Sequence, residues 1–157
     1  MRYTGNVSSL SRLELASDIP PVGPEVRRAA VAAVFGPEND LLFIHRAERE
    51  GDIWSGHMAF PGGREEPDDA SLLATAMRET SEEIGLDLSA ARCLGALTAL
   101  NSPRNTPGRR LQVVPWVFEL PTWPKLTPNQ HEVAGVVRFD FDRFLRREAR
   151  GTFIYTW

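Results

Sequence analysis

The sequence predicts one α/β domain in which a mixed β-sheet is covered by helices on both faces. Two observations indicate this class: several apolar segments of strand length surround one strong helix, and shorter helical segments lie near the ends of the chain. The chain has 157 residues, of which 42% are hydrophobic and 25% are charged. This composition is typical of an ordinary globular domain that is long enough to bury a core.

We expect an N-terminal arm over residues 1–26 and a single domain over residues 27–157. Within the arm, the segment SSLSRLEL (8–15) is predicted to form a short helix that begins at Ser8 or Ser9. Three prolines before residue 25 prevent this helix from continuing. The arm is therefore expected to be an appendage to the core.

The first strands are expected at residues 27–35 (RRAAVAAVF) and 41–47 (LLFIHRA). The turn-forming sequence GPEND lies between them, so the two apolar runs are predicted to join as in a β-hairpin. A short strand is expected in HMAFPGG (57–63), where a proline and two glycines end the apolar segment in a tight loop.

The strongest helix is predicted over residues 70–84, which contain neither glycine nor proline. The sequence PDD (67–69) supplies its start signals, and Gly85 stands where a left-handed C-terminal cap is needed. Four residues recur at helical spacing and are expected to form its buried stripe: Leu73, Met77, Thr80 and Ile84.

Shorter elements are expected in the second half of the chain. Strands are predicted at 93–100, 111–120, 132–141 and 152–157, and a short helix at 142–150.

Composition also limits the setting and the partners. A single cysteine, Cys93, cannot form an intramolecular disulfide, so we expect a core thiol in a reducing, cytoplasmic setting. The longest apolar run, AAVAAVF from Ala29, is far shorter than the roughly 20 residues that span a bilayer. The net charge of -3 argues against a general nucleic-acid groove. We therefore expect neither membrane nor nucleic acid as a partner, and a homodimer stays open.

A cluster of glutamates on the central helix carries the chemistry. Glu79, Glu82 and Glu83 stand at i, i+3 and i+4, so their side chains share one face and can converge. Three like charges repel unless solvent, an arginine or a divalent metal ion neutralises them. Arg78 can pair with and orient a carboxylate but cannot neutralise all three. A metal site and a solvated acidic face are the two interpretations of this pattern.

The residues around the cluster favour the metal site. FPGG followed by RETSEEIGL resembles the signature of the Nudix hydrolase family. Matching positions are Gly63, Arg78, Glu79, Glu82, Glu83, Gly85 and Leu86. The gap from Gly63 to Arg78 is one residue longer than the usual pattern, so the upstream acid of the signature is either Asp68 or Asp69, and Thr80 replaces the usual apolar residue.

The longer gap is similar to that of the coenzyme A pyrophosphatase branch of the family. LLFIHRA, SGHMAFPGG, VVPWVFEL and TPNQHEV also resemble segments of that branch, so the similarity extends over roughly residues 27 to 139. The resemblance implies a Nudix-type α/β/α sandwich with a mixed sheet and a loop-helix-loop catalytic motif. It also implies metal-dependent hydrolysis of a nucleoside diphosphate linked to a group X. The leading candidate is coenzyme A, cleaved to 3',5'-ADP and 4'-phosphopantetheine.

Other readings of the resemblance stay open. In a second hypothesis the chemistry is the same, but the substrate is a nucleoside sugar, a dinucleoside polyphosphate or a nucleoside triphosphate. In a third hypothesis the domain is a nucleotide-sensing module that binds without turnover.

The resemblance also implies roles for particular residues. Glu79, Glu82 and Glu83 would bind Mg²⁺ or Mn²⁺ with help from the carbonyl of Gly62, and Arg78 would orient the acidic face. One of the glutamates would act as the general base, with Glu132 as a weaker candidate.

Contacts with the small-molecule substrate are expected from residues around the glycine loop and from a later loop. Gly63 is one expected contact, and Arg46 and Arg64, which flank it, can bind phosphate. Trp54 can stack on a base or an acyl group. Arg104 lies in a loop that can close over the substrate. For each of these side chains, an ordinary surface role is the alternative.

Overall fold

The structure is a computed structural model that describes residues 10, 13–16, 18–51, 54–101 and 110–146. Its elements follow in the order β1 (Arg27–Phe35), β2 (Asp40–Arg46), β3 (Met58–Ala59), β4 (Gly62–Arg64), α1 (Leu72–Ile84), β5 (Arg92–Ala96), β6 (Leu100–Asn101), β7 (Leu111–Glu119), β8 (Val133–Asp140) and α2 (Phe141–Leu145).

The strands form one mixed sheet with β1 at its centre. β1 pairs in parallel with β7 along its whole length and antiparallel with β4. β2 pairs antiparallel with β3 and β8, while β5 and β6 pair antiparallel with β7. The predicted β1–β2 hairpin is paired in register only at its tip, where Phe35 faces Leu41. Beyond the tip, β4 takes the place beside β1.

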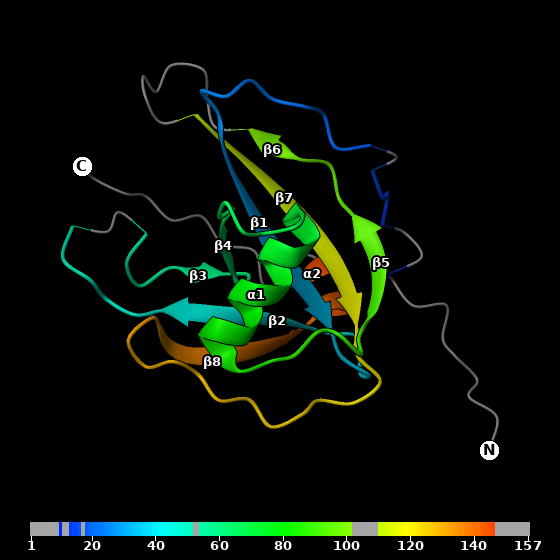
Figure 1. The fold of residues 1–157 in the computed structure, drawn as a ribbon. Coiled ribbons are helices and arrows are strands. Elements are labelled where there is room, and N and C mark those ends of the chain that lie inside the picture. Colours follow the sequence, from blue (N-terminus) through cyan, green and yellow to red (C-terminus); the bar gives the residue numbers. More distant parts are fainter. Residues whose placement is uncertain (1–9, 11–12, 17, 52–53, 102–109, 147–157) are drawn as a thin grey trace.

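Helices cover both faces of the sheet, as predicted. Alternate residues of β1 point to opposite sides: Ala32 and Val34 join the core beneath α1, whereas Ala33 and Phe35 join a second cluster with Phe141 of α2. The rings of Phe35 and Phe141 meet edge to face at 5.0 Å. In Figure 1, α1 lies across the front of the sheet and α2 lies behind it. The expected α/β/α sandwich is confirmed.

Helix α1 ends at the predicted Gly85 but begins two residues later than predicted, with Ser71 rather than the PDD sequence (67–69) as its N-cap. The side chain of Ser71 accepts a hydrogen bond from the backbone N–H of Ala74 at 3.1 Å, and Gly85 adopts the left-handed conformation (φ 67°). The predicted buried stripe is only partly correct, because Leu73 and Met77 are half-buried at the margin of the core. The fully buried face is offset toward smaller side chains, which let the helix approach the sheet closely. It consists of Leu72, Thr75, Ala76, Thr80, Glu83 and Ile84.

The described part of the N-terminal arm packs along the sheet. Leu15 forms a β-bridge with Leu97, and the backbone N–H of Ala16 donates to the carbonyl of Ala96 at 2.7 Å. The helix predicted over residues 8–15 is therefore wrong at Leu15, where pairing with the sheet edge replaces local helical bonding; Ser8 and Ser9 lie outside the described residues. Cys93, expected in the core, is exposed on the edge strand β5.

The second half of the chain follows the predicted order with shorter elements. The segment predicted as one strand over 93–100 divides into β5 and β6, and the register of β5 shifts near Gly95 (φ 135°). Helix α2 covers the start of the predicted 142–150 helix, and the strand expected at 152–157 lies outside the described residues. Within the described ranges, none of the helices has the length and apolar character needed to cross a bilayer.

Candidate active site

Asp69 anchors the arginine of the motif. Its Oδ1 accepts a hydrogen bond from Arg78 Nε at 2.9 Å, and its Oδ2 accepts one from Arg78 Nη2 at 3.0 Å. Hydrogen bonding to Arg78 holds the pKa of Asp69 well below its usual range, and the same pair raises the pKa of Arg78. Asp68 is exposed to solvent. The structure therefore selects Asp69 over Asp68 as the acid that pairs with Arg78.

Arg78 in turn orients two of the three helix glutamates. Its Nη1 donates to Glu79 Oε1 at 3.1 Å and to Glu82 Oε2 at 3.0 Å. Its Nη2 also donates to the carbonyl of Arg64 at 3.1 Å, which ties the helix to β4. The guanidinium thus connects the helix start, the acidic face and the glycine-bearing strand.

Glu83 is the buried carboxylate of the site. Its side chain reaches β4, where the backbone N–H of Gly62 donates to Oε2 at 2.9 Å, and the residue is only 5% exposed. Burial raises the pKa of Glu83 to about 7, against the opposing hydrogen bond from Gly62, and the charge of Glu79 raises it further. Burial likewise raises the pKa of Glu79. Both carboxylates therefore favour a nearby positive charge.

The two glycines of the loop are needed for different reasons. A side-chain carbon on Gly63 would lie 2.3 Å from the carboxylate of Glu79, so the absence of a side chain admits that carboxylate. Gly62 has a φ of +151°, and a side chain there would collide with the backbone of Ala30 at 2.3 Å. Gly63 shapes the site, whereas Gly62 permits the pairing of β4 with β1.

A fourth glutamate, Glu132, comes from the loop before β8. Burial is the main cause of the raised pKa of Glu79 and Glu83, and the charge of Glu132 adds to it. The backbone N–H of Asn129 donates to the carbonyl of Glu83 at 2.8 Å, so the loop is tied to the end of α1. From the sequence, Glu132 is only a weaker candidate because it has no local link to the helix motif; its sole signal is the TPNQHEV resemblance.

The residues predicted to contact the substrate lie on different elements and differ in exposure. Arg46 lies at the end of β2, and its charge partly offsets the burial that raises the pKa of Glu83. Arg64 is exposed at the end of β4. Trp54 is 58% exposed and touches His57 edge to face. Arg104 lies outside the described residues.

The donor set fits a hard divalent cation. Carboxylate oxygens are the ligands that Mg²⁺ and Mn²⁺ prefer. Burial, followed by the neighbouring carboxylates, raises the pKa of Glu79 and Glu83, and a bound cation would favour the ionised form of both groups. In the part of the chain that the structure describes, no three His, Cys, Asp or Glu side chains are grouped so that they could hold a metal ion. Glu79 and Glu82 are turned to Arg78 instead, so chelation would require a change of side-chain conformation.

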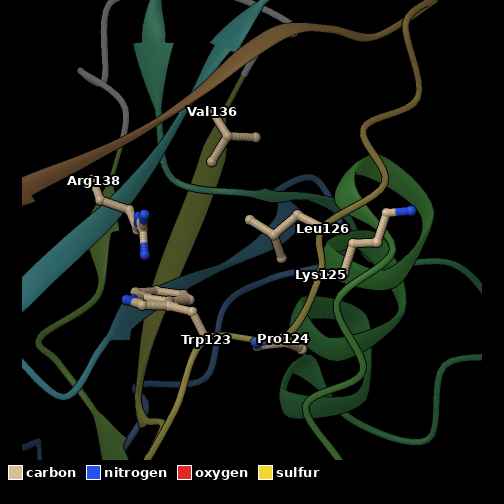
Figure 2. Close-up of a pocket in the computed structure, with 6 residues that line it drawn as sticks. All are labelled: Trp123, Pro124, Lys125, Leu126, Val136 and Arg138. Carbon is tan, nitrogen blue, oxygen red and sulfur yellow. The ribbon is translucent and has the colours of Figure 1, made fainter.

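A cavity of about 480 Å³ lies elsewhere, beside β8. Figure 2 shows the guanidinium of Arg138 over the ring of Trp123, with a distance of 5.5 Å from its central carbon to the ring centroid. Trp123 Nε1 donates to Asp40 Oδ2 at 2.8 Å. None of the predicted site residues lines this cavity, whose walls are Trp123, Pro124, Lys125, Leu126, Val136 and Arg138.

Together, the fold and the site define an α/β/α domain in which an acidic helix face meets a glycine-bearing strand through a tethered arginine. This is the class of domain expected from the sequence motif. A family model described as the NUDIX domain matches residues 25–155. The chain therefore belongs to the NUDIX family.

Curated relatives support this assignment. The chain is 39% identical over 112 residues to an "Uncharacterized Nudix hydrolase NudL" of Yersinia pestis, a match that covers 70% of this chain and 53% of the relative. The chain thus spans about half the length of the curated relatives it matches. These relatives carry the hydrolase name that the sequence resemblance implies.

Solved structures support the fold. A Caenorhabditis elegans Ap4A hydrolase in a binary complex aligns with a TM-score of 0.62 and 17% identity, covering 77% of this chain and 85% of that one. The NUDIX domain of Shewanella oneidensis NrtR complexed with ADP ribose aligns with a TM-score of 0.59 and 15% identity, covering 80% and 82%.

Proposed function

We propose that the protein is a metal-dependent Nudix pyrophosphatase that hydrolyses a nucleoside diphosphate linked to a group X. The arrangement of Asp69, Arg78 and Glu83 carries this proposal, because it positions the helix glutamates against the glycine loop. Phosphoanhydride hydrolysis depends on positioning, charge neutralisation and an activated water more than on a covalent protein nucleophile. Family membership and the hydrolase names of the relatives support the same class.

Each residue of the site has a proposed role. Glu79, Glu82 and Glu83, with the carbonyl of Gly62, would hold Mg²⁺ or Mn²⁺, the metals that the family resemblance implies. The metal supplies charge neutralisation at the phosphates and activation of water. Arg78 orients Glu79 and Glu82. A carboxylate accepts the proton of the attacking water as a new P–O bond forms and the bridging P–O bond breaks.

Coenzyme A or a derivative is the leading substrate. The similarity of residues 27 to 139 to the coenzyme A pyrophosphatase branch, including the longer gap after Gly63, supports this choice. Arg46 and Arg64 would contact phosphates, and Arg104 would contact the 3'-phosphate. Trp54, with more than half of its surface exposed, is available to stack on a base or an acyl group. We place the reaction in the cytoplasm because the chain has one cysteine.

A product assay tests the proposal. The protein is incubated with coenzyme A, ADP-ribose, a nucleoside triphosphate and a dinucleoside polyphosphate, each with Mg²⁺ or Mn²⁺ and with a chelator control, and the products are identified by mass spectrometry. Release of 3',5'-ADP and 4'-phosphopantetheine that requires metal is the expected result. Glu83→Gln should abolish this turnover, while Glu119→Gln, which alters an exposed ion pair with Arg92, should leave it unchanged.

Other outcomes separate the alternatives. Turnover of ADP-ribose or of a dinucleoside polyphosphate without coenzyme A cleavage would support the same hydrolytic mechanism but a different substrate. These two substrates are included because the solved structures are an Ap4A hydrolase and a domain complexed with ADP ribose. Tight nucleotide binding with no product under saturating metal would overturn catalysis in favour of a sensing module. Undiminished hydrolysis by Glu83→Gln would refute the assignment of the site.

A further inference from the structure

Arg49 links the two segments that flank the acidic site. It follows β2, and its backbone N–H donates to Ser55 Oγ at 2.7 Å within the β2–β3 connection. Its side chain crosses to the loop before β8, where both Nε and Nη2 donate to the carbonyl of His131. The Nε bond is 3.1 Å long. One side chain thus joins segments that are remote in the sequence.

His131, whose carbonyl accepts the hydrogen bonds from Arg49, directly precedes Glu132. Arg49 Nη2 also lies 3.8 Å from Glu132 Oε1. Both groups are substantially exposed, so this ion pair contributes little to stability by itself. Its geometric effect is larger, because the two donors of Arg49 hold the carbonyl oxygen of His131, the residue that Glu132 follows.

The backbone of Glu132 is fixed from other directions. The N–H of Ala47 donates to the Glu132 carbonyl at 2.8 Å, and the N–H of Glu132 donates to the Asn129 carbonyl at 2.9 Å. The backbone N–H of Asn129 in turn donates a hydrogen bond to the Glu83 carbonyl at the end of α1. With the backbone held, the side chain of Glu132, 42% exposed, still has several conformations available. Its ion pair with Arg49 favours the conformations in which the carboxylate lies near the guanidinium.

We propose that Arg49 is a positioning residue that directs Glu132 toward Glu79 and Glu83, and thereby couples the β2–β3 connection to the acidic site. The inference rests on the proposed hydrolase function and adds a residue outside the helix motif to its machinery. Arg49 acts through Glu132 and is not itself a group that touches the reacting atoms.

Arg49→Lys tests the geometry while retaining the positive charge. An ammonium group cannot reproduce the planar fork on the His131 carbonyl. With the substrate found in the product assay, we expect kcat to fall about tenfold and KM to change less than about twofold, because a small misplacement of a catalytic group slows chemistry more than binding. Arg92→Lys, at an exposed ion pair on β5, is the matched control and should leave both constants unchanged.

A double-mutant cycle identifies the route of the effect. In a Glu132→Gln background, Arg49→Lys should lower kcat less than about twofold further, because its target is already removed. An equal loss of kcat in both backgrounds, or a loss confined to KM, would overturn the proposal. So would a single variant with unchanged kcat.

Hydrogen exchange tests the positioning role of Arg49 independently of the proposed hydrolase function. Amide exchange across residues 129–133 should accelerate in Arg49→Lys and stay unchanged in Arg92→Lys. Unchanged exchange in Arg49→Lys would refute the positioning role even in an active enzyme. A wild-type protein that hydrolyses none of the tested diphosphates refutes the proposed function, which is a different measurement.

Discussion

Replacing Asp69 by asparagine removes the charge that holds Arg78 while nearly preserving the shape of the side chain. Asp69 Oδ2 accepts three hydrogen bonds, from Arg78 Nη2, Thr75 Oγ1 and the backbone N–H of Glu66, and Oδ1 accepts one from Arg78 Nε. An amide offers one acceptor oxygen, so its NH₂ group must face N–H donors at the other position. The ion pair and at least one hydrogen bond are lost.

The magnitude follows from these contacts. A hydrogen bond to a charged group contributes about 1.5–3 kcal/mol net. The Asp69 side chain is only 6% exposed, but that of Arg78 is 24% exposed and retains other carboxylate partners. We therefore expect a loss of about 2–3 kcal/mol in the free energy of unfolding. For a chain of this size, that loss lowers Tm by roughly 5–10 °C.

Calorimetry of the metal-free protein at pH 7 provides the measurement, with Asp68→Asn as the control. Asp68 is exposed, so its substitution should change the free energy of unfolding by less than about 0.5 kcal/mol. Hydrolysis should also fall in Asp69→Asn, because Glu79 and Glu82 lose their tethered partner. Equal Tm values for the two variants would refute the reasoning.

The pH dependence gives a further check on Asp69. Its pKa in the folded protein lies below the ordinary 3.8, so its contribution to stability is present above that value and is lost as pH falls through the lower, folded pKa. The Tm difference between the wild-type protein and Asp69→Asn should persist from pH 8 to pH 5 and shrink in stronger acid. A difference that vanishes already at pH 6 would contradict the pairing with Arg78.

Three other predictions concern the site and helix α1. The pKa of Glu83 is raised from 4.5 to about 7, so its contribution to stability is present below 4.5 and is lost as pH rises through 7. In chelator, Glu83→Gln should therefore stabilise the protein at pH 8 by up to about 3 kcal/mol, with a much smaller effect at pH 5; thermal melts at both values check this. Gly63→Ala should displace the flexible carboxylate of Glu79, lowering hydrolysis at least tenfold while Tm falls little, whereas Gly62→Ala should lower Tm strongly because it meets backbone. Ser71→Ala removes the cap of α1 and should cost about 1 kcal/mol in urea unfolding, with m unchanged.

Local sequence signals predicted much of α1 and the sheet. The C-cap glycine of α1 and the apolar runs of β1 and β7 are properties of short segments, so their positions could be inferred without the tertiary structure. The buried stripe of α1 could not be placed correctly. Its rotation depends on how closely Ala76 approaches the sheet, which is a property of packing between elements.

Some features of the site could likewise be predicted from local sequence, and others depend on the tertiary structure. Glu79, Glu82 and Glu83 share a helix face by spacing alone, but the choice between Asp68 and Asp69 depends on which side chain meets Arg78 across a turn. Arg49 and the placement of Glu132 have no local signal, because a hydrogen bond to the His131 carbonyl requires two remote segments to be brought together.

The parallel pairing of β1 with β7 has a consequence for the order of assembly during synthesis. β1 is in register with β7 from Arg27–Leu111 to Phe35–Glu119, so the centre of the sheet cannot close until the ribosome has translated residue 119. Gly62 is paired to β1, and Glu132 is translated later still. Most of the chain is therefore synthesised before β1 can pair with β7. During this time the apolar strands are exposed, and binding by chaperones would protect them from aggregation.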